Sequence, residues 1–497
     1  MSDAVVVNRV RAGFYLDSVA LMRASRTVEE RAGVEAAALM IGTEANRALL
    51  DDAALLAEAG RGAGANDLIV AVRAADAAAA EGAIEAALEL LDRPAPATAG
   101  ASEWVPRSLD TALRALPGAN LAIVSVPGAF AAREARRALA RGLNVMVFSD
   151  NVSVADERAL KEEARARGLL MMGPDCGSAI IAGAPLGFAN AVNRGEIGIV
   201  AASGTGLQEV SCLIARAGGG ISHAIGVGGR DLSDAVGGIT TLAAIDALDA
   251  DAATQRIVLI SKPPGAAVTA RVFERIAASA KPFTVCFFGL DAPVVPANAA
   301  FTPTLRAAAE HALGGATLGA DFDPPPAGRD PGRHRIVGLY AGGTLCAEAE
   351  TILIAAGEAV RSNVPIPGAL PLSPGDADGG HVLIDLGADE YTLGRPHPMI
   401  EPAVRREALA RALADDSAAV ILLDVVIGHG AHHDPAGAIA GVLAGVTRRP
   451  AVVASVCGTD GDPQVYGDQV EILRRAGAIV APSNAHAAEA ALAVIGR

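Results

Sequence analysis

The chain has 497 residues, of which 51% are hydrophobic and 3% aromatic, and its 41 Lys and Arg against 56 Asp and Glu give a formal net charge of −15. The length suggests three or four domains of ordinary size, and the aromatic-poor composition favours α/β layers over an aromatic-rich β-sandwich. A surface this acidic argues against nucleic acid or an anionic membrane as a partner, although helix N-termini can still bind small anions.

The sequence pattern of residues 1–93 predicts a small α/β domain. Apolar stretches predict strands in VVVNRV, VEAAALMIG and DLIVAV, and the segments 18–32, 43–59 and 76–92 have helical periodicity. The Pro- and Ala-rich stretch 94–103 reads as a linker.

Three further α/β units follow, over 105–192, 193–317 and 335–497, with the Pro-, Gly- and Asp-rich stretch 318–334 as a linker before the last. Strands such as LAIVSV, RIVLIS and AVILLDVVIG alternate with helical segments. This spacing predicts parallel sheets with right-handed crossovers.

The third and fourth units contain an internal duplication. The segment 199–218 aligns with 338–357 at a constant offset of 139, which pairs Gly204 with Gly343 and Glu209 with Glu348. Further along, KPFTVCFFGLD echoes RPAVVASVCGTD with one residue inserted. The repeat indicates that two copies of one structural unit carry the same strand-to-helix turn.

Each copy places small residues between a buried strand and a helix. Such a turn leaves the first helical N–H groups unpaired, lets a ligand approach the backbone, and puts the positive end of the helix dipole next to an anion. Neither turn is a Walker loop or a complete GxGxxG motif, and a tight turn without a ligand is the simpler alternative. The predicted phosphate-binding residues are Ser203, Gly204, Thr205, Gly206, Gly342, Gly343 and Thr344.

Other candidate residues follow predicted strands or lie in glycine-rich loops. Asp175 and Cys176 could line a cleft, or belong to a Pro/Gly loop in which Asp175 caps its own turn. Arg230 could clamp a phosphate or carboxylate, or pair with Asp231 on the surface. Lys262 follows a strand at the edge where α/β sheets bind ligands, or it is simply solvated.

The fourth unit adds Arg395 and His397, which follow a strand that ends in acidic residues. The loop after the next strand holds His429, His432 and His433. Three histidines in five residues raise the possibility of a metal site, but the loop has no fixed facial spacing and no second cluster, so we predict no metal.

The five cysteines are far apart, without CxxC or Cys/His metal spacing, and are expected to be buried, reduced thiols. The amino-terminal segment lacks the apolar core of a signal peptide, and the chain has no uninterrupted apolar run of about 18 residues. A cytoplasmic location without a membrane span is the expectation.

Long motifs along almost the whole chain resemble the FdrA family. They include NVMVFSDNVSVADE, GLLMMGPDCGSAIIAGAPLGFAN, HAIGVGGRDLSDAVGGI, IDLGADEYTLGRPHPMIEP and LLDVVIGHGAHHDPAG. FdrA proteins are in turn similar to succinyl-CoA synthetase. The resemblance implies a multi-domain α/β fold with a Rossmann-like CoA-binding-type domain at 105–192. Two flavodoxin-like ligase-type domains at 193–317 and 335–497 resemble the α subunit and the β-subunit carboxy-terminal domain.

Three departures from succinyl-CoA synthetase affect the expected activity. The ATP-grasp domain has no counterpart, and the first glycine loop that contacts CoA has no clear match. After FFGLDAP, where the phosphohistidine segment should follow, the sequence VVPANAAFTPTLRAA holds no histidine. His311 lies in a later helical stretch and does not match.

The resemblance therefore favours a subunit of a hetero-oligomeric oxamate carbamoyltransferase of allantoin catabolism, which interconverts oxalurate and phosphate with oxamate and carbamoyl phosphate. Carbamoyl phosphate or phosphate would lie between the two helix N-termini, with Arg230, Lys262, Arg395 and His397 as catalytic candidates. An acyl-CoA synthetase that binds CoA and a non-catalytic acyl-phosphate-binding scaffold are the alternatives. Partner subunits and a homodimer or larger assembly are expected.

Overall fold

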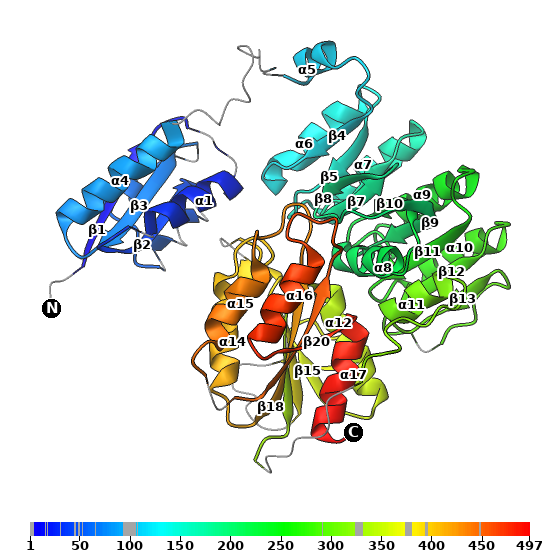
Figure 1. Ribbon diagram of the computed structural model, residues 1–497. Coiled ribbons are helices and arrows are strands. Elements are labelled where there is room, and N and C mark those ends of the chain that lie inside the picture. The colour runs from blue at the N-terminus through cyan, green and yellow to red at the C-terminus, as the bar shows by residue number, and fades with distance from the viewer. Residues whose placement is uncertain are drawn as a thin grey trace. The chain divides into compact units, whose positions relative to one another are not determined.

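The computed structural model describes residues 4–14, 16, 18–29, 31–43, 46–47, 50–51, 53–64, 66–92, 106, 108–290, 292–323, 332–372, 380–392, 396–446 and 449–497. The chain divides into two compact units, the first formed mainly by residues 1–105 and the second by most of the remaining chain (Figure 1). Each unit is described by itself.

The first unit is a small antiparallel sheet covered by helices. The described strands and helices are β1 (Val5–Arg11), α1 (Ser18–Glu29), β2 (Val34–Ile41), α3 (Glu58–Arg61), β3 (Leu68–Ala74) and α4 (Ala77–Asp92). The strand order is β1-β3-β2, and β3 is almost completely buried between its two neighbours. β3 takes the central position because, apart from Arg73, its side chains are uncharged on both faces.

The second unit begins with a three-stranded parallel sheet of order β4-β5-β6. Its elements are α5 (Leu109–Ala115), β4 (Leu121–Val124), α6 (Gly128–Leu139), β5 (Asn144–Val147), α7 (Val154–Ala166) and β6 (Met171–Met172). Helices cross over between the parallel strands, as the spacing in the sequence predicts.

A seven-stranded sheet of order β13-β12-β11-β9-β10-β7-β8 follows. Its elements are β7 (Ser178–Ile181), β8 (Ala184–Gly187), β9 (Arg194–Ala201), α8 (Gly204–Arg216), β10 (Ile221–Gly226), α9 (Ile239–Ala250), β11 (Arg256–Ser261), α10 (Ala266–Ala277), β12 (Phe283–Phe287), β13 (Ala299–Phe301) and α11 (Leu305–Ala312). The β7–β8 hairpin, which the sequence places with the preceding unit, pairs here with β10 through Ile180 and Ala224.

The last part forms a second seven-stranded sheet, of order β16-β15-β17-β14-β18-β19-β20. Its elements are β14 (Arg335–Tyr340), α12 (Gly343–Ala355), β15 (Val360–Ser362), β16 (Leu370–Pro371), β17 (His381–Asp385), α13 (Asp389–Thr392), α14 (Ala403–Leu413), β18 (Ala418–Val426), α15 (Pro435–Leu443), β19 (Ala451–Cys457), α16 (Tyr466–Arg475), β20 (Ile479–Ala481) and α17 (Asn484–Ile495).

The duplicated turns occupy the same place in both large sheets. β9 and β14 are each the central strand, and each leads through a glycine turn into α8 or α12. β9 lies between β10 and β11, and β14 lies between β17 and β18, so the chain leaves in opposite directions on the two sides. Ligands of open α/β sheets bind at such switch points, at the carboxyl ends of the strands.

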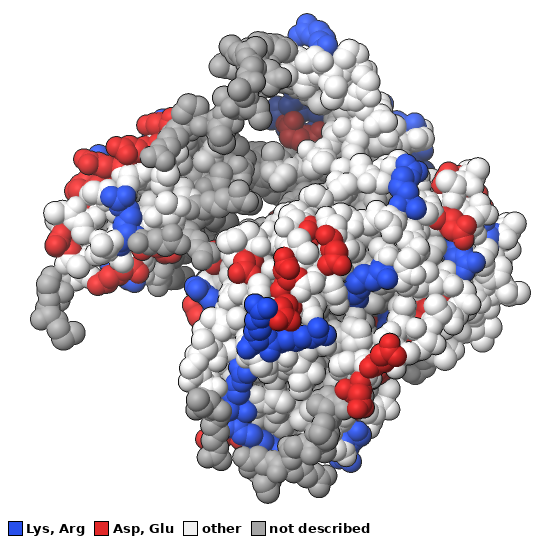
Figure 2. Space-filling view, in the orientation of Figure 1, with Lys and Arg blue, Asp and Glu red and all other residues white. Residues whose placement is uncertain are grey.

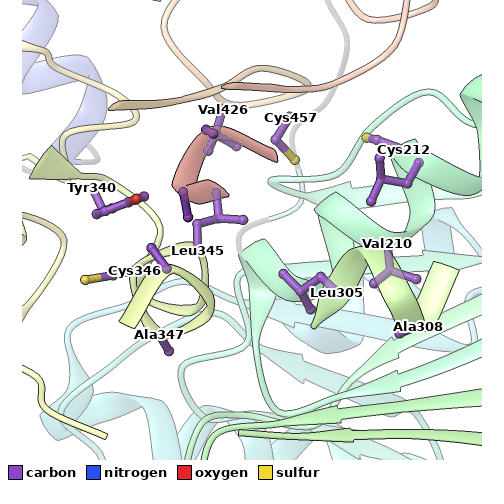
Figure 3. Close-up of a cluster of buried hydrophobic side chains, with 14 of the residues drawn as sticks. Val210, Cys212, Leu305, Ala308, Tyr340, Leu345, Cys346, Ala347, Val426 and Cys457 are labelled. Carbon is purple, nitrogen blue, oxygen red and sulfur yellow. The ribbon is translucent and has the colours of Figure 1, made fainter. Parts of the chain in front are cut away.

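One hydrophobic core joins the two large sheets. It includes Val210 and Cys212 of α8, Leu345 and Ala347 of α12, and Leu305 of α11 (Figure 3). All five side chains are at most 1% exposed. Because this apolar surface is removed from water on both sides at once, the two helices are held together with their amino-terminal ends adjacent.

Charged side chains of both signs lie on the surface. Basic and acidic side chains are interspersed on the face shown in Figure 2. In the part of the chain that the structure describes, no helix has both the length and the apolar character needed to cross a membrane. All five cysteines are buried and free of disulfides, which confirms the prediction made from their spacing.

Candidate functional site

Helix α8 starts at a serine cap. Ser203 is extended (φ −149°, ψ 123°), and its Oγ accepts a hydrogen bond from the Gly206 N–H at 2.9 Å. Within the described ranges, the N–H groups of Gly204 and Thr205 have no hydrogen-bond acceptor. These donors lie at the positive end of the helix dipole, so the turn offers two backbone N–H groups to an anion.

Helix α12 starts at a turn held by a buried carboxylate. The N–H groups of Ala341 and Gly342 donate to Asp424 at 2.9 and 2.7 Å, and Arg405 forms an ion pair with Asp424 at 2.7 Å. The next two N–H groups, on the first residues of α12, have no acceptor among the residues that the structure describes. Asp424 therefore fixes the turn without using the first two N–H groups of the helix.

The two helix ends meet directly. Ser203 Oγ and Thr344 Oγ1 form a hydrogen bond. A Cβ added to Gly342 would lie 2.9 Å from Thr205 Cγ2, and one added to Gly206 would lie 3.1 Å from Thr344 Cγ2. The seven residues predicted from the glycine turns thus come together, with the hydroxyl groups of Ser203 and Thr344 in contact where the two helix ends meet.

A lysine and an aspartate flank the start of α12. A Cβ added to Gly343 would lie 2.4 Å from Asp385 Oδ2 and 3.0 Å from Lys262 Nζ. Lys262 follows β11 and forms no ion pair with any described residue. Burial raises the pKa of Asp385 to about 6, and the positive charge of Lys262 opposes that rise. The side of the helix pair next to Gly343 therefore carries both a cation and a carboxyl group that changes charge near neutral pH.

His397 lies next to this pair. A Cβ added to Gly387 would lie 2.5 Å from His397 Nε2 and 3.1 Å from Asp385 Oδ1. Burial lowers the pKa of His397 to about 4, so the ring is neutral at physiological pH. The Met399 N–H donates to Nδ1 at 3.3 Å, which places the proton of the neutral ring on Nε2. His397 is therefore an uncharged hydrogen-bond donor.

Asp175 reaches the turn before α8. Its backbone has φ 55°, and a Cβ added to Gly229 would lie 3.5 Å from its Oδ2 and 4.0 Å from the carbonyl oxygen of Ala202. The side chain keeps contact with solvent, but the surrounding protein and the charges of Asp150 and Asp389 raise its pKa to about 6. Arg230 and Lys262 lower that pKa.

Cys176 does not line a cleft, contrary to the prediction. Its side chain is 2% exposed and packs in the core of the first seven-stranded sheet, where its Sγ lies 3.4 Å from the Gly226 carbonyl oxygen. Burial raises the pKa of this thiol to about 12. The turn at Asp175 directs the side chain of Cys176 into the core, so only Asp175 contributes a polar group to the site.

We expect the cysteines of the folded protein to resist thiol reagents. Since a thiolate is the reactive form, a buried thiol with a raised pKa reacts slowly. Titration with Ellman's reagent at neutral pH should give almost no colour in buffer and all five thiols in denaturant. Fast labelling of one native thiol would contradict the burial.

Arg230 is engaged elsewhere. Its guanidinium pairs with Glu157 at 2.9 Å and donates to the Val152 carbonyl oxygen at 2.7 Å. The alternative of a pair with Asp231 is also wrong, because Asp231 is fully buried and pairs with Lys161 at 2.7 Å. The arginine therefore holds the loop against α7, and its positive charge acts on the site only through space.

The other candidates of the fourth unit are Arg395 and the histidine loop. Arg395 lies outside the described residues. The rings of His432 and His433 contact each other at a tilt of 35°, with centroids 4.3 Å apart. The described residues contain no group of three metal-ligating side chains. The histidine loop instead packs through its backbone, where His429 N–H donates to the Ala189 carbonyl oxygen at 2.9 Å.

Sequence reasoning missed Asp385 and Asp424 as individual residues. Each lies in or at the end of an apolar strand that neighbours β14, and both carboxylates converge on the turn before α12. The available signal was an acidic residue in two runs, HVLID and VILLD, that are otherwise apolar. The tertiary structure decides which strands neighbour β14, so the two sequence runs alone could not show that Asp385 and Asp424 approach the same turn.

Comparisons with known families match three regions. Residues 339–494 match the CoA-ligase domain, residues 192–289 match the CoA binding domain, and residues 1–106 match the heavy metal-associated domain of AllF. The CoA binding match falls on the first seven-stranded sheet rather than on 105–192, where the resemblance placed it. Residues 1–106 contain neither cysteine nor histidine, so thiolate and imidazole ligands for a heavy metal are missing there.

Individual relatives extend these matches. The chain is 40% identical over 496 residues to the uncharacterized protein YahF of Escherichia coli, with 96% of both chains covered. It is 32% identical over 154 residues to the α subunit of the ADP-forming succinate–CoA ligase of Aquifex aeolicus, covering 30% of this chain and 49% of that subunit. A structure of the dinucleotide forming acetyl-coenzyme A synthetase 1 of Ca. Korarchaeum cryptofilum aligns at 15% identity and a TM-score of 0.32, over 76% of this chain and 82% of that chain.

Proposed function

The chain belongs to the FdrA family of succinyl-CoA synthetase-like proteins, and on this premise we propose that it is a subunit of an oxamate-type carbamoyltransferase. The reaction interconverts oxalurate and phosphate with oxamate and carbamoyl phosphate. The match of residues 1–106 to an AllF domain supports a role in allantoin nitrogen catabolism. The proposed reaction needs no cofactor, because phosphate itself attacks the carbamoyl carbon.

The observation that carries the proposal is the pair of helix ends with open backbone donors beside Lys262. Four N–H groups at the starts of α8 and α12 can bind phosphate oxygens, and Lys262 Nζ can neutralise their charge. His397 can donate its Nε2 proton to the carbamoyl oxygen as negative charge develops there.

The direct test is turnover by the assembled enzyme. The chain would be produced with the proteins encoded beside its gene and given oxamate and carbamoyl phosphate, and oxalurate would be quantified by chromatography. Oxalurate formation that requires this chain supports the proposal. Turnover by the chain alone would contradict the need for partner subunits, and phosphate binding without any turnover would favour a non-catalytic scaffold.

Anion binding should strengthen as the pH falls. Asp175 and Asp385 have pKa values of about 6, so both are mostly negative above that pH and repel an anion at the helix ends. Protonation below the pKa removes the repulsion, and binding should take up protons. Sulfate, whose own charge is constant in this range, should therefore bind several times more tightly at about pH 5 than at about pH 8. Calorimetry in two buffers measures both effects, and pH-independent affinity would contradict the site.

The matches to CoA-ligase and CoA binding domains support acyl-CoA synthesis as a second candidate. It predicts CoA binding and a phosphorylated histidine after incubation with ATP. Against it stands the segment 294–308, which lacks the histidine that the resemblance requires. Mass spectrometry of the ATP-treated protein and calorimetry with CoA separate the two candidates.

A further inference from the structure

We propose that Asp385 is the proton-transfer residue of this site, and that it moves the proton of the attacking phosphate to the leaving nitrogen of the acyl donor. The inference rests on the carbamoyl transfer proposed above and deepens it. It assigns a chemical role to a residue at the α12 end of the site, next to Lys262 and His397.

The carboxyl group of Asp385 is aimed by its surroundings. Asn363 clamps the backbone on both sides, accepting from the Asp385 N–H at 2.8 Å and donating to its carbonyl oxygen at 3.0 Å. Oδ1 accepts the Gly387 N–H at 2.9 Å. Oδ2 has no hydrogen-bond partner in the described ranges and lies next to Gly343, at the open end of α12. One oxygen is therefore held by the protein, while the other has no hydrogen-bond partner among the described residues.

The residue pair Gly343 and Gly387 makes this orientation possible. The Asp385 carboxyl group lies between them. A Cβ on Gly343 would lie 2.4 Å from Oδ2, and a Cβ on Gly387 would lie 3.1 Å from Oδ1. With hydrogen atoms in place of these side chains, a phosphate bound to the first N–H groups of α12 can approach Oδ2 closely.

Charged groups from three other elements act on Asp385. Lys262 after β11 favours the carboxylate, whereas Asp424 of β18 and Glu350 of α12 disfavour it, and burial raises the pKa to about 6. The neutral His397 adds no charge. A carboxylate with this pKa is present at neutral pH and still accepts a proton readily, which suits a general base.

The step balances without another reactant. An oxygen of monohydrogen phosphate attacks the carbamoyl carbon of oxalurate, forming a C–O bond. The C–N bond to the oxamate nitrogen breaks, and its electron pair goes to that nitrogen. The Asp385 carboxylate removes the phosphate proton and delivers it to the same nitrogen. Carbamoyl phosphate and oxamate result, and Asp385 returns to its starting charge.

The test is the Asp385→Asn variant in the assembled enzyme. Its kcat should fall by about 100-fold or more, the range of a lost general base, whereas calorimetry should still detect binding of inorganic phosphate. When kcat/KM is calculated from the concentration of monohydrogen phosphate at each pH, which removes the ionisation of phosphate itself, the wild-type value should fall as pH drops through about 6 because the Asp385 carboxylate becomes protonated. This acid limb should be absent in Asp385→Asn. Asp385→Glu should recover part of the activity.

Asp416→Asn, which changes an exposed carboxylate of the same sheet unit, is the matched control and should behave as wild type. Asp385→Asn with near wild-type turnover, or with the acid limb retained, would overturn the inference while leaving carbamoyl transfer intact. Absence of carbamoyl transfer in the wild-type complex would instead overturn the proposed function, and this inference with it.

Discussion

The Gly343→Val variant should lose carbamoyl transfer by about 100-fold or more, together with its affinity for phosphate and sulfate. A Cβ at this position would come within 2.4 Å of Asp385 Oδ2 and 3.0 Å of Lys262 Nζ, and valine adds two methyl groups beyond it. The side chain would displace both polar groups and cover the first N–H groups of α12. Loss of anion affinity is measured on the chain alone, so it does not depend on partner subunits.

Gly441→Val is the matched control for this variant. Gly441 lies in helix α15, and a Cβ there meets nothing within 4 Å. We expect little change in stability, because the low helix propensity of a β-branched residue offsets the gain in helix propensity from replacing glycine. Gly343→Val with phosphate affinity and activity close to those of Gly441→Val would show that ligand does not approach the start of α12.

The Lys161→Ala variant should destabilise the second unit by about 3–5 kcal/mol. Lys161 Nζ is fully buried, where it pairs with Glu157 at 2.9 Å and Asp231 at 2.7 Å and donates to the Val227 carbonyl oxygen at 2.9 Å. Without the ammonium group, two carboxylates remain in the interior with much less positive charge to compensate them. The loop that follows β10 would lose its attachment to α7.

Arg158→Ala on the same helix provides the comparison. Arg158 pairs with Glu162 at 3.0 Å on the surface, where both side chains are about half exposed, so the loss should be at most about 1 kcal/mol. Urea unfolding followed by circular dichroism measures both variants. Equal midpoints for Lys161→Ala and Arg158→Ala would show that the buried network contributes no more than a surface pair.

Secondary structure was most predictable where local signals were strong. The runs RIVGLY, HVLID and AVILLDVV form β14, β17 and β18, because apolar β-branched runs bounded by glycine favour buried strands. The predicted helix at 43–59 fails at residues 53–57. There the buried side chain of Asn8 bonds the Leu55 carbonyl oxygen and the Ala57 N–H, a distant contact that replaces helical hydrogen bonds.

The candidate site was predictable in part for the same reason. Glycine turns and their internal repeat are local patterns, so the two helix starts could be named before the structure. Arg230 looked available because its partner, Glu157, is 73 positions away in the sequence. Cys176 looked exposed because its loop is rich in Pro and Gly, whereas the direction of each side chain depends on the backbone path through that loop.

The sequence by itself determined the α/β class, the duplicated turns and the chemistry they offer, because these depend on periodicity and on residue types close together in the chain. Only the tertiary structure decided that Ser203 and Thr344 meet and that Lys262, Asp385 and His397 surround the start of α12. Parallel sheets bring the ends of strands together across more than a hundred residues. The order of strands in the sheets, set by packing of the shared core, therefore selects which polar side chains become neighbours.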